Sequence, residues 1–242
     1  MAIEKITGIV VDTVRHNDRH NIVTLFTRSR GRIAFLSPVG SGKAGRMRNA
    51  RLMPLSVVEA DVNIRQNREL QSLGSIMPAE VWRNIYFNPV KSSIALFLSE
   101  FLNRYLRDSS PDHVAWDFIL ASLRILDNTD KGLANFHIWF LIRFLDIAGI
   151  APDLSGYENG DAFDMRGGIP VVDEHIHKDI LSPAETRLLV LLSRISVTNM
   201  RFFRFTGNDR RRLLDRILRY YAIHFPGLSG LKSPDVLSDV FA

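Results

Sequence analysis

The spacing of apolar residues changes once along the chain, near Pro78, and this change constrains the fold more than any other feature. Before Pro78, short β-branched stretches of roughly alternating polarity are separated by polar or glycine-containing turns, as is typical of strands. Five such stretches occupy residues 6–14, 22–27, 32–39, 54–64 and 69–76. Five short strands within residues 3–76 predict a small antiparallel barrel.

After Pro78 the apolar residues recur every three or four positions, which indicates amphipathic helices. Helices are expected at 89–107, 111–128, 135–148, 188–195 and 213–223. The third of these stretches is apolar around almost its whole circumference and should be the most buried helix. Residues 150–180 are rich in Gly, Asp and Pro and predict a loop with a small β-hairpin.

The sequence therefore predicts an α+β chain. An OB-fold-like β-barrel at 1–78 is followed by a helical domain at 79–242, with a β-insertion at about 150–180. The sequence has no run of eighteen apolar residues, and its opening lacks the profile of a signal peptide. It contains no cysteine, which excludes disulfides and cysteine zinc sites and fits a cytoplasmic protein.

The basic charge gathers in two segments. Residues 1–70 carry 12 basic and 6 acidic residues, and residues 201–219 carry 7 and 2, whereas residues 71–200 carry 11 and 16. Charged residues often do no more than solvate a surface. A basic first third followed by an acidic middle nevertheless favours a nucleic-acid surface near the start of the chain.

The stretch PVGSGKAGRMRNAR, residues 38–51, contains Gly-Ser-Gly-Lys and invites comparison with a nucleotide-binding phosphate loop. That motif needs a glycine five positions before its Gly-Lys and a Ser or Thr after it. Here Ser37 and Ala44 occupy those positions, so the tight turn and the magnesium ligand are missing. We expect instead a mobile loop whose four cations contact a polyanion backbone: Lys43, Arg46, Arg48 and Arg51.

Two further groups of cations are candidates for phosphate contact. Arg28, Arg30 and Arg32 surround a turn, and on a barrel they can join residues 43–51 in one cationic groove, with Phe26 and Phe35 as candidate stacking rings or core residues. Arg212, Arg216 and Arg219 are spaced to lie on one helical face. For both groups, plain solvation of a surface stays an open alternative.

Metal and catalytic motifs are weak. His175 and His177, with Asp173, could hold a metal on a strand edge, but no second ligand group has a recognisable spacing. The acidic residues at 158–164 lack the order of a calcium loop. The alternative class of function is a nucleotide-using or metal-dependent enzyme with a degenerate phosphate loop at 40–44.

The order of these features resembles the RecO family of bacterial recombination mediators. The resemblance lies in GIVVDTVRHNDRHNIVTLFTRSRGRIAFLSPVG at the start, FLIRFLDIAGIAPDLSGY after the buried helix, and LKSPDVL near the end. Many members carry paired cysteines that bind zinc in the β-insertion. This chain has none, so the resemblance implies that zinc has been lost. We expect packing of Phe163, Ile169 and Val171 to hold the insertion instead.

The resemblance implies a protein without enzymatic activity or cofactor. Such proteins bind single-stranded and double-stranded DNA, anneal strands and help load recombinase onto DNA coated with single-strand-binding protein (SSB). The implied partners are RecR, in some bacteria RecF, and the acidic C-terminal tail of SSB; the implied location is the cytoplasm, at the nucleoid. Many relatives place arginine before the Phe that opens the central helix, where this chain has Asn135. We therefore expect the tail to bind more weakly, or through Arg124 or Lys131.

Overall fold

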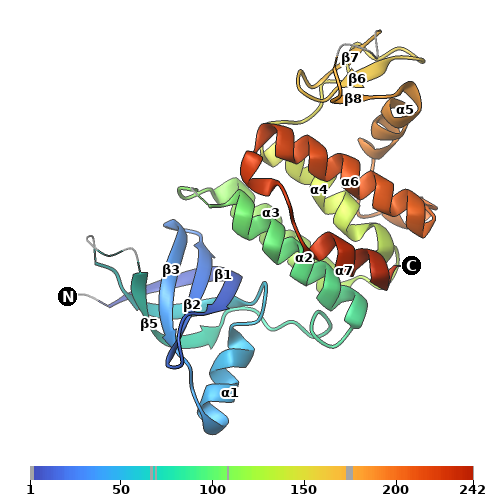
Figure 1. Cartoon of the computed structure of the whole chain (residues 1–242). Helices are drawn as coiled ribbons and strands as arrows, with labels where there is room; N and C mark the ends of the chain where they lie inside the picture. The colour runs from blue at the N-terminus through green and yellow to red at the C-terminus, as the bar shows by residue number, and fades with distance from the viewer. Residues whose placement is uncertain (1–2, 66–67, 69, 108, 173–176, 242) are drawn as a thin grey trace. The chain divides into compact units, whose positions relative to one another are not determined.

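The chain divides into two compact units, residues 1–128 and 129–242. The computed structural model in Figure 1 describes residues 3–65, 68, 70–107, 109–172 and 177–241. Within these residues, no helix combines the length and the apolar content that a membrane crossing requires.

The first unit contains a closed five-stranded barrel. Its strands are β1 (Glu4–Arg15), β2 (His20–Thr27), β3 (Gly31–Pro38), β4 (Val57–Asn63) and β5 (Leu70–Pro78). They follow one another around the barrel in the order β1-β2-β3-β5-β4, and only β3 and β5 are parallel. The predicted OB-fold-like barrel is confirmed, but the expectation of a wholly antiparallel barrel is wrong at the β3–β5 pair. Alternation of apolar residues determines which face of each strand is buried.

The two phenylalanines considered as stacking rings belong to the core. Phe35 lies inside the barrel among Val10, Leu25 and Val58. Phe26 is also fully buried, and its ring lies 5.9 Å from the ring of Trp116 on α3 (His113–Asn128). Neither ring is available to a base at the surface.

Two helices of the first unit cover the barrel. In α2 (Pro89–Tyr105), the hydroxyl of Ser99 donates a hydrogen bond to the carbonyl of Val11 on β1, over 2.9 Å. The predicted helices at 89–107 and 111–128 correspond to α2 and α3. A domain boundary at 78/79 stays a prediction, since β5 ends at Pro78 while these two helices group with the barrel in the first unit.

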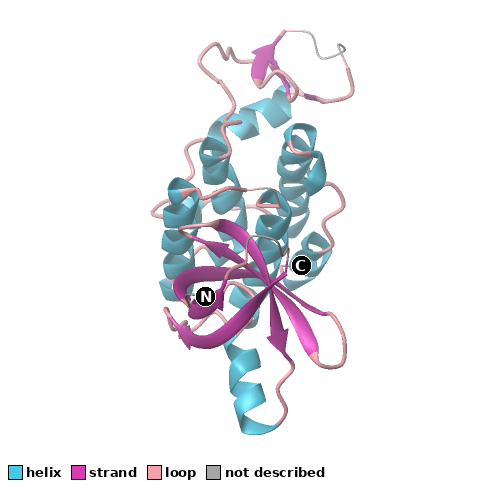
Figure 2. Ribbon diagram, turned by 90° about the vertical axis from the view of Figure 1, so that its left-hand side faces the viewer, coloured by secondary structure: helices cyan, strands magenta, loops and turns pink. Residues whose placement is uncertain are grey.

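The expectation that residues 38–51 form a mobile loop is wrong in part, because Gly42–Arg51 form helix α1. It is the helix below the strands in Figure 2. Most residues of α1 are good helix formers, but only Gly45 among them is buried, so no apolar stripe announces the helix in the sequence.

The second unit is built around α4 (Phe136–Ile147), in which nine of twelve residues are buried. This confirms the expectation for the most apolar helix. The other helices are α5 (Pro183–Leu192), α6 (Gly207–His224) and α7 (Ser233–Val240), with short 3-10 turns η1 (Leu133–Asn135), η2 (Met200–Phe202) and η3 (Pro226–Leu228). Helix α7 was not predicted, and α5 begins five residues before the expected 188 because Ser182 and Glu185 form a capping box.

The β-insertion is a three-stranded sheet instead of a hairpin. Strands β6 (Ala162–Asp164), β7 (Ile169–Val171) and β8 (Ile180–Leu181) pair in the order β7-β6-β8. Phe163 is fully buried, and its ring lies 6.1 Å from that of Tyr220 on α6. Ile169 is exposed and Val171 is half-buried, so of the three expected packing residues Phe163 alone anchors the sheet.

Candidate nucleic-acid interface

Helix α1 is tied to the barrel by two of its arginines. The guanidinium of Arg48 donates to Ser37 Oγ over 2.9 Å and to the carbonyls of Leu73 and Gly74 over 3.0 Å each. Arg51 donates to the carbonyl of Ile76 on β5. Burial, with the nearby charge of Arg51, lowers the pKa of Arg48. These two arginines therefore hold α1 in place, and their guanidinium groups are engaged mainly by hydrogen bonds within the protein.

The other two cations of α1 face solvent. Lys43 and Arg46 are exposed and three positions apart, so they lie on one face of the helix. Arg19, in the turn between β1 and β2, comes to the same end of the barrel because its carbonyl accepts a hydrogen bond from Val39 N–H over 2.8 Å. We call Arg19, Lys43 and Arg46 the α1 patch. Within the part of the chain that the structure describes, none of the three forms an ion pair.

The start of α1 adds to the positive potential of the patch. Ser41 precedes the helix without a side-chain cap, and no acidic residue occupies the first turn. The free N–H groups at a helix N-terminus carry partial positive charge, which attracts anions. Lys43 stands in that first turn, so the helix end and the side chain act on the same region.

The glycines of the degenerate phosphate loop have a packing role. A Cβ at Gly45 would lie 2.0 Å from the backbone carbonyl of Gly40, so the two glycines pack directly against each other. This contact lets the chain turn from β3 into α1. The Gly-rich pattern of residues 40–45 is thus explained without a bound nucleotide.

The three cations around the β2–β3 turn are paired within the first unit. Arg30 makes a two-pronged ion pair with Glu4, with Nε at 3.0 Å and the terminal nitrogen at 2.7 Å. Arg28 lies 3.5 Å from Asp117, and Arg32 donates to Asn103 over 3.2 Å. These residues also do not share one extended strand face, because β2 ends at Thr27.

The β2–β3 turn and α1 lie at opposite ends of β3. The turn precedes the strand, and α1 follows it. Eight residues of strand separate them by roughly 25 Å at about 3.3 Å per residue. A continuous cationic groove between them stays a prediction, and such a groove would have to run along the length of this strand.

The basic face of α6 is used mainly inside the second unit. Arg216 Nε donates to Glu185 of α5 over 2.7 Å, and Arg219 Nε donates to Asp179, before β8, over 3.1 Å. Arg212 is exposed, and its charge adds to the hydrogen bonds from Thr206 that lower the pKa of Asp209. Of the three predicted residues on this face, Arg212 has the most freely presented charge.

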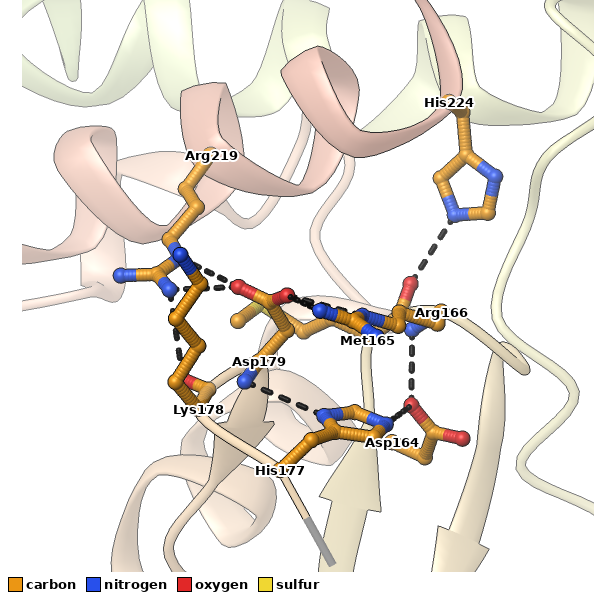
Figure 3. A network of polar contacts seen from close by, with 8 residues as sticks. All are labelled: Asp164, Met165, Arg166, His177, Lys178, Asp179, Arg219 and His224. Carbon is orange, nitrogen blue, oxygen red and sulfur yellow. Dashed lines mark hydrogen bonds and ion pairs between the residues drawn. The ribbon is translucent and has the colours of Figure 1, made fainter.

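Asp179 organises the polar network under the β-insertion (Figure 3). One carboxylate oxygen faces Arg219, and the other accepts from Arg166 Nε over 2.8 Å. The hydrogen bond from Arg219, more than any other contact, lowers the pKa of Asp179. The insertion is thus joined to α6 by a carboxylate between two guanidinium groups.

A second contact of this network involves His177. Its Nδ1 accepts from the backbone N–H of Asp179 over 3.2 Å, and its Nε2 lies 3.1 Å from Asp164 (Figure 3). His175 and Asp173, weighed with it as metal ligands, lie outside the described residues. Among the described residues, no three His, Cys, Asp or Glu side chains gather as a metal site would require.

The two candidates for binding an acidic partner tail have different surroundings. Arg124, in the first unit, forms an ion pair with Glu80. Lys131, in the second unit, lines an open cleft of about 520 Å³ together with Arg201. A separate apolar cavity of about 360 Å³ lies between α4, α5 and α6, with Arg212 and Arg216 among its lining residues.

Sequence reasoning overlooked several cations that the fold exposes. Arg19 could have been found from strand pairing, since His20 pairs with Pro38 and so brings residue 19 beside residue 39. In the second unit, Arg201 and Arg204 are exposed on either side of the sequence Phe202-Phe203. A basic-aromatic run just before a helix is the signal that would have pointed to them.

Comparison with known proteins covers nearly the whole chain. Residues 1–82 match the family described as "Recombination protein O N terminal", and residues 86–234 match "Recombination protein O C terminal". A DNA repair protein RecO of Phocaeicola vulgatus is 35% identical over 99% of this chain and 100% of its own length. That of Porphyromonas gingivalis is 36% identical over 97% of both chains, and that of Bacteroides fragilis 33% over 99% of both.

Proposed function

The chain belongs to the RecO family of DNA repair proteins, and from that premise we propose that it is a DNA-binding recombination mediator without enzymatic activity. It binds single-stranded and double-stranded DNA, anneals complementary strands and helps load recombinase onto SSB-coated DNA. It works in the cytoplasm at the nucleoid and needs no cofactor.

The observation that carries this proposal is the α1 patch. Lys43 and Arg46 project from a helix whose other two arginines are fixed to the barrel, so the charge is presented on a rigid support. Such cations neutralise phosphates and release counterions, without reading the base sequence. Binding should therefore be similar for unrelated sequences and should weaken steeply with salt.

Annealing follows from cations in more than one place. Two complementary strands repel each other through their phosphates, and a protein that contacts both reduces this repulsion. The α1 patch supplies one contact, and Arg212 of the second unit supplies another exposed cation. The paired residues Arg28, Arg30, Arg32, Arg216 and Arg219 contribute only where phosphate replaces their present partners, which weakens their share.

The proposed partner proteins are RecR and SSB, with RecF a partner of such proteins in some bacteria. An acidic tail with an apolar tip needs a cation beside apolar surface. Lys131 remains the candidate cation for the acidic part of the tail, because Arg124 is already paired with Glu80. The cleft that Lys131 lines has one apolar residue, Val197, so the apolar tip has to bind outside that cleft. Calorimetry with a synthetic tail peptide tests this assignment: Lys131→Ala should weaken binding, and Arg124→Ala should change it less.

The function is tested by strand annealing of two complementary oligonucleotides, bare and coated with SSB. Lys43→Ala/Arg46→Ala should slow annealing and weaken binding to both forms of DNA. A matched control, Lys5→Ala/Arg104→Ala, removes the same charge from residues that already have carboxylate partners, Glu59 and Glu100. If the α1 double variant anneals as fast as the wild type, the proposed role of the patch is refuted.

A further inference from the structure

Phe202 is an aromatic ring displayed on the surface of the second unit. Its residue is 65% exposed, whereas Phe136, Phe140, Phe144 and Phe163 of the same unit are fully buried. Fully burying such a side chain would stabilise the fold, and an exposed ring forgoes that stabilisation. An aromatic ring that a structured turn holds in solvent is a candidate contact for a ligand or partner.

The turn that carries Phe202 is held from below. The side-chain amide of Asn135, itself buried, donates to the carbonyls of Met200 and Phe203 over 2.9 and 2.8 Å, on either side of the ring. Gly132 packs against Arg201, since a Cβ there would lie 3.0 Å from the Arg201 backbone. Phe202 thus projects from a rigid 3-10 turn, which reduces the entropy lost when a ligand binds.

One cation lies over the ring, and a second is close to it in the chain. The guanidinium carbon of Arg201 lies 4.6 Å from the ring centroid, and Arg204 is exposed two residues further on. The open cleft of about 520 Å³ beside them is lined by Lys131, Arg201, Thr129, Thr198, Asp130 and Val197. We call Arg201, Phe202 and Arg204 the η2 platform.

This combination fits a ligand with flat apolar faces joined by anionic links. A base can stack on the open part of Phe202 or on the Arg201 guanidinium, while phosphates contact Arg204 and Lys131. An apolar peptide side chain would need a concave apolar pocket, but Val197 is the one apolar residue among those lining the cleft. A duplex hides the faces of its bases, so the platform suits unpaired strands.

We propose that the η2 platform stacks an unpaired base of single-stranded DNA, making the second unit a strand-selective contact. This rests on the proposed DNA binding and adds to it a site where the two forms of DNA are distinguished. The α1 patch contacts phosphates of either form, whereas the η2 platform engages bases that only a single strand exposes.

The test measures binding of the full chain to a single-stranded oligonucleotide carrying 2-aminopurine and to a duplex of the same length. Phe202→Ala should weaken single-strand binding between about fivefold and 150-fold, the range for one stacked base. Duplex binding and the salt slope should not change, because no charge is removed. Phe202→Trp should keep the affinity and quench 2-aminopurine.

The matched control is Phe87→Ala in the first unit, which removes the other exposed phenylalanine among the described residues, at 82% exposure. It should leave both affinities unchanged, and thermal unfolding should show that both variants fold.

Equal single-strand binding by Phe202→Ala and the wild type overturns the stacking site alone. Loss of acidic-peptide binding with single-strand binding intact overturns it in favour of a protein partner. A wild type that binds no DNA overturns the proposed function as well.

Discussion

Replacing Asp179 by Asn should loosen the β-insertion from α6. Asp179 is 6% exposed. One oxygen of its carboxylate lies 2.7 Å from the Arg166 guanidinium, and the other forms an ion pair with Arg219. Removing one partner of a buried ion pair costs about 3–5 kcal/mol. Here the Arg166 and Arg219 side chains are 53% and 38% exposed and can be rehydrated. We therefore expect a loss of about 2 kcal/mol, or roughly 6 °C in melting temperature for a chain of this size.

The effect should depend on pH in a defined direction. Hydrogen bonds from Arg219 and Arg166 hold the pKa of Asp179 below its ordinary value. The stabilisation is therefore fully present above the unfolded pKa of about 3.9 and is lost as pH falls through the lower folded value. The difference between wild type and Asp179→Asn should be constant between pH 5 and 7 and should shrink below pH 4.

The assay is urea denaturation at several pH values, followed by circular dichroism. Asp215→Asn is the control, because Asp215 is an exposed carboxylate of the same helix α6. It should change the free energy of unfolding by less than about 0.5 kcal/mol. If Asp179→Asn is as stable as this control at pH 7, the network in Figure 3 does not hold the insertion, and the reasoning is refuted.

Three further predictions concern stability. Arg48→Ala should lower the free energy of unfolding by about 2 kcal/mol, because it removes the hydrogen bonds that tie α1 to the barrel. The control Lys43→Ala/Arg46→Ala should lower it by less than about 0.5 kcal/mol. Equal losses for the two variants in urea denaturation would contradict this prediction. Burial lowers the pKa of His137 to about 3. The free energy of unfolding should therefore decrease as the pH drops below about 6.5, by at most about 1.4 kcal/mol per pH unit. A pH 5–6 slope that persists in His137→Gln would exclude that source. EDTA should leave the melting temperature unchanged, and a drop of many degrees would reveal a structural metal.

The parts of the fold that could be predicted are those that bury an apolar stripe. Strand β2 and helices α2 and α4 follow directly from alternation or from spacings of three and four. Helix α1 could not be found in this way, because only Gly45 of its ten residues is buried. The start of α5 was readable from Ser182-Pro183 followed by Glu185, a capping signal that apolar periodicity does not report.

The roles of individual cations were harder to predict than the fold. Arg46 and Arg48 are two positions apart in one basic run, but one faces solvent and the other donates to barrel carbonyls. Charge composition gives the presence of a basic segment, whereas the helix and its neighbours decide which side chains stay free. Arg216 and Arg219 show the same limit, because their carboxylate partners lie 31 and 40 positions away along the chain.

The most direct test of the DNA-binding proposal is the salt dependence of single-stranded DNA affinity for the wild type and for Lys43→Ala/Arg46→Ala. Each lost phosphate contact should reduce the slope of log affinity against log salt by about 0.7. The double variant should therefore bind more weakly at low salt, with a slope shallower by about 1.4. An unchanged affinity and slope would contradict the account. So would tight, magnesium-dependent ATP binding that the double variant loses.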